Sequence, residues 1–135
     1  MSLDAFLNPI ETEQVFEFTV SDRFKNKDGS IATIKMKTLT QAENDAIIKR
    51  CQIKETGKNG VVSTWLDTMK YQDMLILECI VEPNFASEEF CKKMGVVDPA
   101  LALKKLFTPA EYIEIINHVN DCMGNILQAG DEAKN

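Results

Sequence analysis

Two helix starts lie ten residues apart in the stretch VDPALALKKLFTPAEY, residues 97–112. At each start a capping residue precedes a proline: Asp98 precedes Pro99, and Thr108 precedes Pro109. Asp and Thr side chains accept bonds from the free N–H groups of a first turn, and a proline at the first helical position loses no hydrogen bond. One continuous helix cannot contain both starts. This stretch is therefore predicted to fold as a short helix that meets a longer one at a corner.

A second capping signal opens an earlier helix. Thr40 and Glu43 have capping-box spacing, in which the hydroxyl and the carboxylate satisfy free backbone N–H groups reciprocally. The apolar residues that follow predict a helix to about Lys54. Residues 55–60 are glycine-rich and polar, so they are predicted to form a mobile surface loop.

The most apolar part of the chain lies in its middle. Residues 66–81 contain neither glycine nor proline and are hydrophobic on most sides, which predicts a central helix. Pro83 is expected to end this helix, because the residue before a proline is pushed out of the helical region. Ser87 then opens a short helix, and Gly95 stops it.

Apolar and polar residues alternate before the first capping signal. Two runs, residues 14–25 and 31–38, flank Lys27, Asp28 and Gly29. Alternation on both sides of an Asp-Gly pair predicts a β-hairpin. We expect Gly29 to have a positive φ angle, which glycine adopts without a steric penalty.

The register of this hairpin follows from its turn. A three-residue loop places Phe24 opposite Ala32 and Val20 opposite Met36, so that apolar residues face apolar residues. Asp22 fits this register poorly, because it lies opposite an isoleucine. A lone hairpin is marginal in water, so its phenylalanine-rich face is expected to pack on helices.

Together these patterns predict an α+β fold, in which an N-terminal β-hairpin packs on a mostly α-helical bundle of four to five helices. With 135 residues, the chain is expected to form a single domain over residues 1–127. The hairpin would take residues 14–38 and the helical part residues 41–127. Residues 128–135 are expected to be a disordered tail.

Composition narrows the classes of partner. The net charge of −6 argues against nucleic acid, which requires a basic surface. No apolar run approaches the roughly 20 residues that span a bilayer, so no membrane is expected. The start of the chain lacks a secretory signal, which predicts a cytoplasmic protein. Basic residues concentrate in residues 21–58 and acidic ones in residues 108–135, which allows self-association into a homo-oligomer.

The sequence offers little catalytic chemistry. The four cysteines are scattered and are interpreted as buried free thiols, although an even count also allows two disulfides. His118 is the single histidine, and with its acidic neighbours it supplies too few good ligands for a metal. No catalytic, cofactor-binding or metal-binding residues are predicted, and the protein is expected not to be an enzyme.

Partner binding is the alternative use of exposed apolar residues. Trp65, the single tryptophan, can serve either core packing or an interface. The short segment after Pro99 carries more large apolar residues than one neighbour can cover. The predicted partner-binding residues are therefore Trp65, Leu101, Leu103, Leu106 and Phe107.

Four ordered blocks carry a family resemblance. SDRFKNKDG, LTQAENDAI, ECIVEPNF and MGVVDPALALKKLFTPAEYIEI resemble, in order and spacing, the XkdN-like tail assembly chaperones of contractile-tailed phages and related prophage elements. The resemblance covers residues 5–127, and VEPNF followed by VVDP and TPAEY is its most specific part.

The resemblance implies a role in phage tail morphogenesis. Such chaperones bind the tape measure protein, keep it soluble, help bring tail tube protein onto it, and are absent from the mature virion. It also implies action in the bacterial host cytoplasm and no catalytic residues. The alternative is a structural tail component, such as a connector or completion protein. Flexible methionines suit varied helical partners, and the candidates for such a surface are Met36, Met69, Met74, Met94 and Met123, although core filling is the expected role of most of them.

Overall fold

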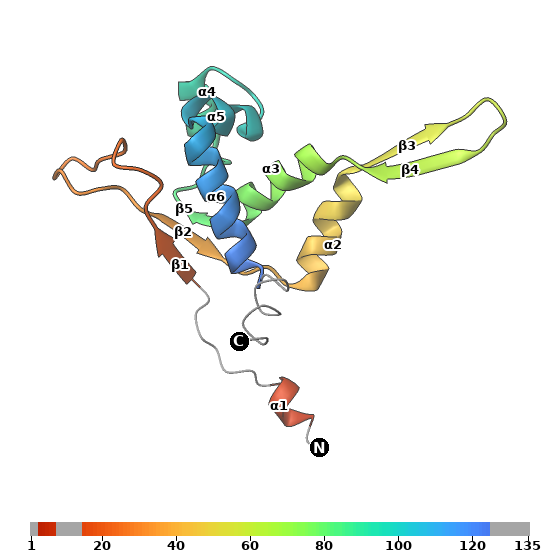
Figure 1. The fold of residues 1–135 in the computed structure, drawn as a ribbon, viewed down its shortest axis with the longest axis horizontal. Helices are drawn as coiled ribbons and strands as arrows, with labels where there is room; N and C mark the ends of the chain where they lie inside the picture. Colours follow the sequence, from red (N-terminus) through yellow and green to blue (C-terminus); the bar gives the residue numbers. More distant parts are fainter. Residues whose placement is uncertain (1–2, 8–14, 125–135) are drawn as a thin grey trace.

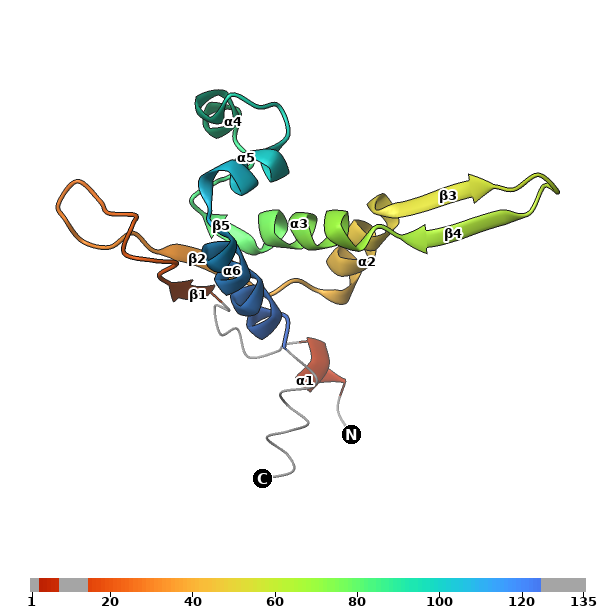
Figure 2. The same cartoon turned by 45° about the horizontal axis from the view of Figure 1, so that its top comes forward.

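The computed structural model describes residues 3–7 and 15–124. Figures 1 and 2 show helices grouped around a small sheet, with a second hairpin projecting from them. The part described is α+β, as predicted, and none of its helices is long and apolar enough to cross a membrane. The elements are α1 (Asp4–Leu7), β1 (Val15–Phe18), β2 (Ile34–Lys37), α2 (Gln41–Arg50), β3 (Gln52–Thr56), β4 (Val62–Leu66), α3 (Thr68–Cys79), β5 (Ile80–Glu82), α4 (Glu88–Met94), α5 (Pro99–Leu106) and α6 (Pro109–Cys122).

Helix α3 lies at the centre of the fold, as its all-round hydrophobicity predicted. It contacts α2, α5 and α6, while α6 also contacts β2. Burial of each large aliphatic side chain contributes about 1.5–3 kcal/mol. The largest fully buried side chains are Met36, Ile47, Ile76, Leu103 and Ile115, which come from β2, α2, α3, α5 and α6.

A three-stranded antiparallel sheet packs beside these helices in the order β1-β2-β5. The predicted helix over residues 66–81 is wrong at its C-terminal end, because α3 stops at Cys79. Residues 80–82 instead form β5, which pairs with β2 through Ile80 opposite Met36. An apolar run bounded by a proline suits a buried strand as well as a helix, so the pattern alone did not separate them.

The projecting hairpin corrects two further predictions. The expected helix to Lys54 ends at Arg50, and the start of the expected central helix, at Leu66, is the last residue of β4. Strands β3 and β4 pair antiparallel, with Ile53 opposite Trp65. Of the loop expected at residues 55–60, residues 55 and 56 instead belong to β3, and the rest lies in the turn of this hairpin, where Gly60 has a φ of +75°.

The N-terminal hairpin has the predicted turn. Gly29 has a φ of +89°, and the Asn26 N–H donates to the Ser30 carbonyl at 2.8 Å across a three-residue loop. The predicted pairing of Phe24 with Ala32 is confirmed by a 2.8 Å bond between the Ala32 N–H and the Phe24 carbonyl.

Further from the turn the predicted register is wrong. Phe16, rather than Val20, lies opposite Met36, and Phe18 lies opposite Ile34. Near the turn the partners are Lys25 and Ile31. Between these two paired regions the first arm therefore contains four more residues than the second. These extra residues leave the ladder as a loop around residues 19–24.

This loop bonds to the start of α6 through a polar clamp formed by Ser21, Arg23 and Glu111. The Ser21 hydroxyl donates to Glu111 Oε2 at 2.5 Å, and Arg23 donates to both carboxylate oxygens at 2.5 and 3.1 Å. Arg23 also donates to the Leu106 carbonyl at 2.7 Å, at the end of α5. The bonds from Arg23 and Ser21 hold the pKa of Glu111 well below its usual range.

The corner between α5 and α6 is built as predicted. Asp98 caps α5 by accepting from the Ala100 N–H, and Thr108 caps α6 through a complete capping box with Glu111. Phe107 lies at the corner and makes edge contacts with Phe24 and Phe85, at centroid distances of 5.4 and 5.8 Å. The clamp and these rings together join the hairpin to the helical corner.

Replacing Gly29 by alanine tests the turn. A β-carbon there meets no atom within 4 Å, so the expected cost of about 1 kcal/mol comes from the positive φ angle alone. Gly57→Ala is the matched control, because Gly57 lacks a positive φ and its β-carbon would make an ordinary 3.5 Å contact. Urea unfolding of both variants measures the difference; equal stabilities would contradict the assigned turn.

The polar clamp predicts a component of acid denaturation. Because the pKa of Glu111 is lowered by folding, its stabilising contribution is complete above about pH 4.3, the unfolded value, and is lost as the pH falls below it. Glu111→Gln is expected to lower the melting temperature near neutral pH and to flatten the decline between about pH 5 and pH 3. Glu114→Gln, on the exposed side of the same helix, is the control; identical pH profiles for both variants would contradict the assignment.

Candidate functional site: a groove along helix α3

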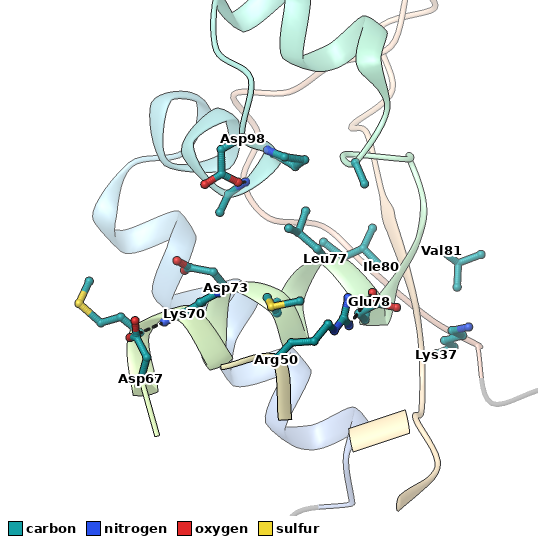
Figure 3. Close-up of a pocket in the computed structure, with 15 residues that line it drawn as sticks. Lys37, Arg50, Asp67, Lys70, Asp73, Leu77, Glu78, Ile80, Val81 and Asp98 are labelled. Carbon is teal, nitrogen blue, oxygen red and sulfur yellow. Dashed lines mark hydrogen bonds and ion pairs between the residues drawn. The ribbon is translucent and has the colours of Figure 1, made fainter. Parts of the chain in front are cut away.

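A depression on the described part of the chain runs along α3. It has a volume of about 960 Å³. Its walls come from the end of α2, the start of α5 and the segment around β5, as Figure 3 shows. The capped start of α5 forms one wall, so the helix start at Asp98 and Pro99 that the sequence predicts helps to shape this groove.

Apolar side chains contribute much of the groove surface. Met69 is 69% exposed and Val81 is 48% exposed, so both are available to a partner. The groove combines these side chains with parts of the core helix, which keeps its floor fixed. Its apolar lining residues are Met69, Met74, Leu77, Ile80, Val81, Ala86, Pro99 and Ala100.

The carboxylates of the groove already have partners. Asp67 caps α3 and Asp98 caps α5 through backbone N–H groups. Asp73 accepts a hydrogen bond from the Tyr112 hydroxyl and forms a 2.7 Å ion pair with Lys104. Glu78 forms a 3.4 Å ion pair with Arg50. Acidic groups in the groove therefore serve mainly to hold its walls together.

Unlike the carboxylates of the groove, two of its lysines have no ion-pair partner in the described part of the chain. The Lys37 and Lys70 ammonium groups make no ion pair with any residue in the described ranges 3–7 and 15–124. Lys70 lies near the start of α3, and Lys37 lies toward the other end of the groove, beside Val81 (Figure 3). The groove thus presents cationic groups along an apolar lining.

The histidine and the cysteines of the described residues make packing contacts and do not form a cluster of metal ligands. Within the ranges described, no group of three His, Cys, Asp or Glu side chains could hold a metal ion. His118 stacks on Phe18 at a centroid distance of 3.8 Å and lies 3.5 Å from Glu114. All four cysteines are free and buried, as the sequence predicted.

The structure separates the predicted partner-binding residues. Leu101 is 51% exposed on the outer side of α5, whereas Leu103 is fully buried and Phe107 is 8% exposed in the core. Leu106 is half-buried and lines a small apolar cavity with Phe107. Trp65 is 44% exposed on β4, away from α5. Exposure thus limits the set available for partner contacts to Trp65, Leu101 and part of Leu106.

The groove itself was only partly anticipated. Of the five methionines considered, Met69 and Met74 line it, whereas Met36 is fully buried in the sheet. Val81 was missed because it was assigned to a helix.

A family model matches nearly the whole chain, and one relative shares its fold. The family model for the phage XkdN-like tail assembly chaperone protein matches residues 3–134. The chain is 26% identical over 116 residues to the uncharacterized protein YqbN of Bacillus subtilis (strain 168), covering 85% of this chain and 77% of that protein. The crystal structure of the protein YqbN has a TM-score of 0.75 at 22% identity, covering 92% of this chain and 97% of that one, which shows a shared fold.

Burial predicts that the thiols are unreactive in the folded protein. It raises the pKa of Cys79 to about 12 and that of Cys122 to about 11, which disfavours the nucleophilic thiolate. We expect a thiol reagent to label the native protein slowly and to label all four cysteines after unfolding in urea. Intact mass should be unchanged by reductant; a native mass lower by two or four hydrogens would contradict the absence of disulfides.

Proposed function

Because the chain belongs to the phage XkdN-like tail assembly chaperone family, we propose that it binds the tape measure protein during tail assembly and keeps it soluble. The observation that carries this proposal is the apolar groove along α3, with two lysines that form no ion pair in the described part of the chain. A protein that shields another from aggregation needs such a surface, and it needs no catalytic group.

The dimensions of the groove suit a helical segment. The 12 residues of α3 extend over about 18 Å, which corresponds to roughly three turns of a partner helix. A helix lying along α3 would place side chains at i, i+3 or i+4, and i+7 against the apolar lining. Met69 and Met74 can adapt to different side chains at these positions, because a thioether chain is unbranched and flexible.

The positive charge of two groove lysines limits which segments of the tape measure protein can bind there. Lys37 and Lys70 would pair with carboxylates that flank an apolar stripe, whereas a basic helix would meet like charge at both places. We therefore expect the bound segment of the tape measure protein to be an acidic amphipathic helix. Exposed ion pairs contribute little affinity, so the lysines select the segment and the apolar lining provides most of the binding energy.

The protein would act in the host cell, before the tail is complete. The chaperone would work without catalysis in the host cytoplasm, help tail tube protein reach the tape measure, and be absent from the finished virion. A connector or completion protein, the alternative role, would remain in the tail. Mass spectrometry of purified particles distinguishes the two, because only the structural role predicts stoichiometric amounts of the chain.

Co-expression with the tape measure protein from the same genome tests the groove. Wild type should keep the tape measure protein in the soluble fraction. The double variant Met69→Glu, Val81→Glu should lose this effect while remaining folded, because both side chains are exposed in the groove and the new carboxylates would repel an acidic helix. Leu101→Glu tests whether the interface extends onto the outer side of α5.

Ile113→Glu is the matched control, because Ile113 is 57% exposed on α6 and does not line the groove. It should retain full solubilising activity. A folded double variant that still solubilises the tape measure protein would place binding elsewhere. An insoluble tape measure protein beside wild type would contradict the chaperone function itself.

A further inference from the structure

The hairpin of β3 and β4 extends away from the helices in both views of the molecule (Figures 1 and 2). All residues from 52 to 65 are exposed. Its apolar residues include Val61, Val62 and Trp65, which are 64%, 59% and 44% exposed. A two-stranded hairpin is marginally stable in water unless it gains further strands or packs against a helix, and the exposed residues of this hairpin lack such a covering within the described part of the chain. This hairpin is therefore an incomplete sheet.

The outer edge of β4 is unprotected. Residues 61–66, VVSTWL, contain no charge and no proline, and they are rich in β-branched and aromatic side chains. Edge strands that face solvent usually carry lysine, proline or a bulge, which prevents pairing with another chain. The outer edge of β3 is protected in this way by Lys54. Of the two strands of this hairpin, β4 is therefore the one with the character of a strand that pairs further.

Two backbone hydrogen bonds, one at each end of the hairpin, decide which backbone groups of β4 face outward. The Gly57 N–H donates to the Val61 carbonyl and the Asp67 N–H donates to the Cys51 carbonyl, each at 2.8 Å. Bonded and non-bonded pairs alternate along an antiparallel ladder. The pairing of Lys54 with Thr64 is therefore of the non-bonded kind. The N–H and C=O groups of Val62, Thr64 and Leu66 consequently point away from β3, toward the free edge.

We propose that β4 pairs antiparallel with β4 of a second copy of this chain, about a two-fold axis at Thr64, to form a four-stranded sheet. In this register the two Thr64 residues exchange backbone hydrogen bonds, and Val62 of each copy pairs with Leu66 of the other. The surface that pairs is the same on both copies, so the assembly closes as a dimer.

Charge favours a second copy through this edge. A two-fold axis places identical residues opposite each other, and β4 has no charge to repel its copy. The same operation on β3, centred on its outward-facing residue, would place Lys54 opposite Lys54. The β4 register also puts the two Trp65 rings diagonally across the axis on one face, within reach of each other and flanked by Ile53.

A proline substitution separates the dimer from the hairpin. Thr64→Pro removes an outward N–H that the hairpin does not use, so it should break the pairing between copies and leave β3–β4 intact. Lys54→Pro is the matched control, because it removes the equivalent outward N–H on the other edge. Sedimentation velocity over a range of concentrations should show wild type and Lys54→Pro at twice 15.2 kDa. Thr64→Pro should raise the dissociation constant roughly ten-fold or more.

A second variant covers the case in which proline disturbs the hairpin. Thr64→Lys keeps the backbone N–H and places like charges across the axis, so it should also favour the monomer, with an unchanged circular dichroism spectrum. Trp65, the single tryptophan, gives an independent readout. Its emission should shift to longer wavelength on dilution of wild type, and in both Thr64 variants the same shift should occur at a concentration roughly ten-fold higher or more.

Two results would overturn the proposal. Wild type that sediments at 15.2 kDa at every concentration would show that this edge does not pair with itself, even if it binds another protein. A wild-type dimer that withstands both Thr64 substitutions in folded protein would show that dimerisation uses a different surface.

Discussion

The carboxylate of Glu111 joins three parts of the structure. It completes the capping box of α6, accepts a hydrogen bond from the Ser21 hydroxyl, and forms an ion pair with Arg23. Arg23 also donates a hydrogen bond to the Leu106 carbonyl at the end of α5. Ser21 and Arg23, which make this contact, lie in the loop that the four extra residues of the first hairpin arm form. Once the clamp is formed, the hairpin register, the α5–α6 corner and the wall of the groove depend on one another.

Helix α3 serves both the core and the proposed binding surface. Its inner side includes Ile76 and Cys79, which are fully buried, while its outer side forms the floor of the groove. A floor supported by close-packed side chains does not have to be ordered when a partner binds, so little conformational entropy is lost there. The adaptable contacts are confined to flexible side chains such as Met69.

Local signals in the sequence predicted local structure well. Four N-caps, at Thr40, Ser87, Asp98 and Thr108, and the Gly29 turn each depend on residues within a few positions of one another, and each is confirmed. The central helix is confirmed except at its two ends. The register of the first hairpin far from its turn depends on the contact between Arg23 and Glu111. These residues are 88 positions apart, so no local sequence pattern around Arg23 reveals it. The β3–β4 hairpin was hidden because VSTWL runs directly into an apolar helix. Within α5, the helical period places Leu101 and Leu103 on opposite sides of the helix. It does not tell which side is exposed, because that depends on how α5 packs against the other elements.

The long separation of the clamp residues has a consequence for synthesis of the chain. Arg23 and Glu111 are 88 residues apart in the sequence, which a ribosome translates in roughly 4 to 18 seconds at about 5–20 residues per second. During this interval the phenylalanines of the first hairpin lack α6 and the corner ring of Phe107 as a packing surface. A member of a tail assembly chaperone family therefore passes through a nascent state in which its own apolar surfaces are not yet covered.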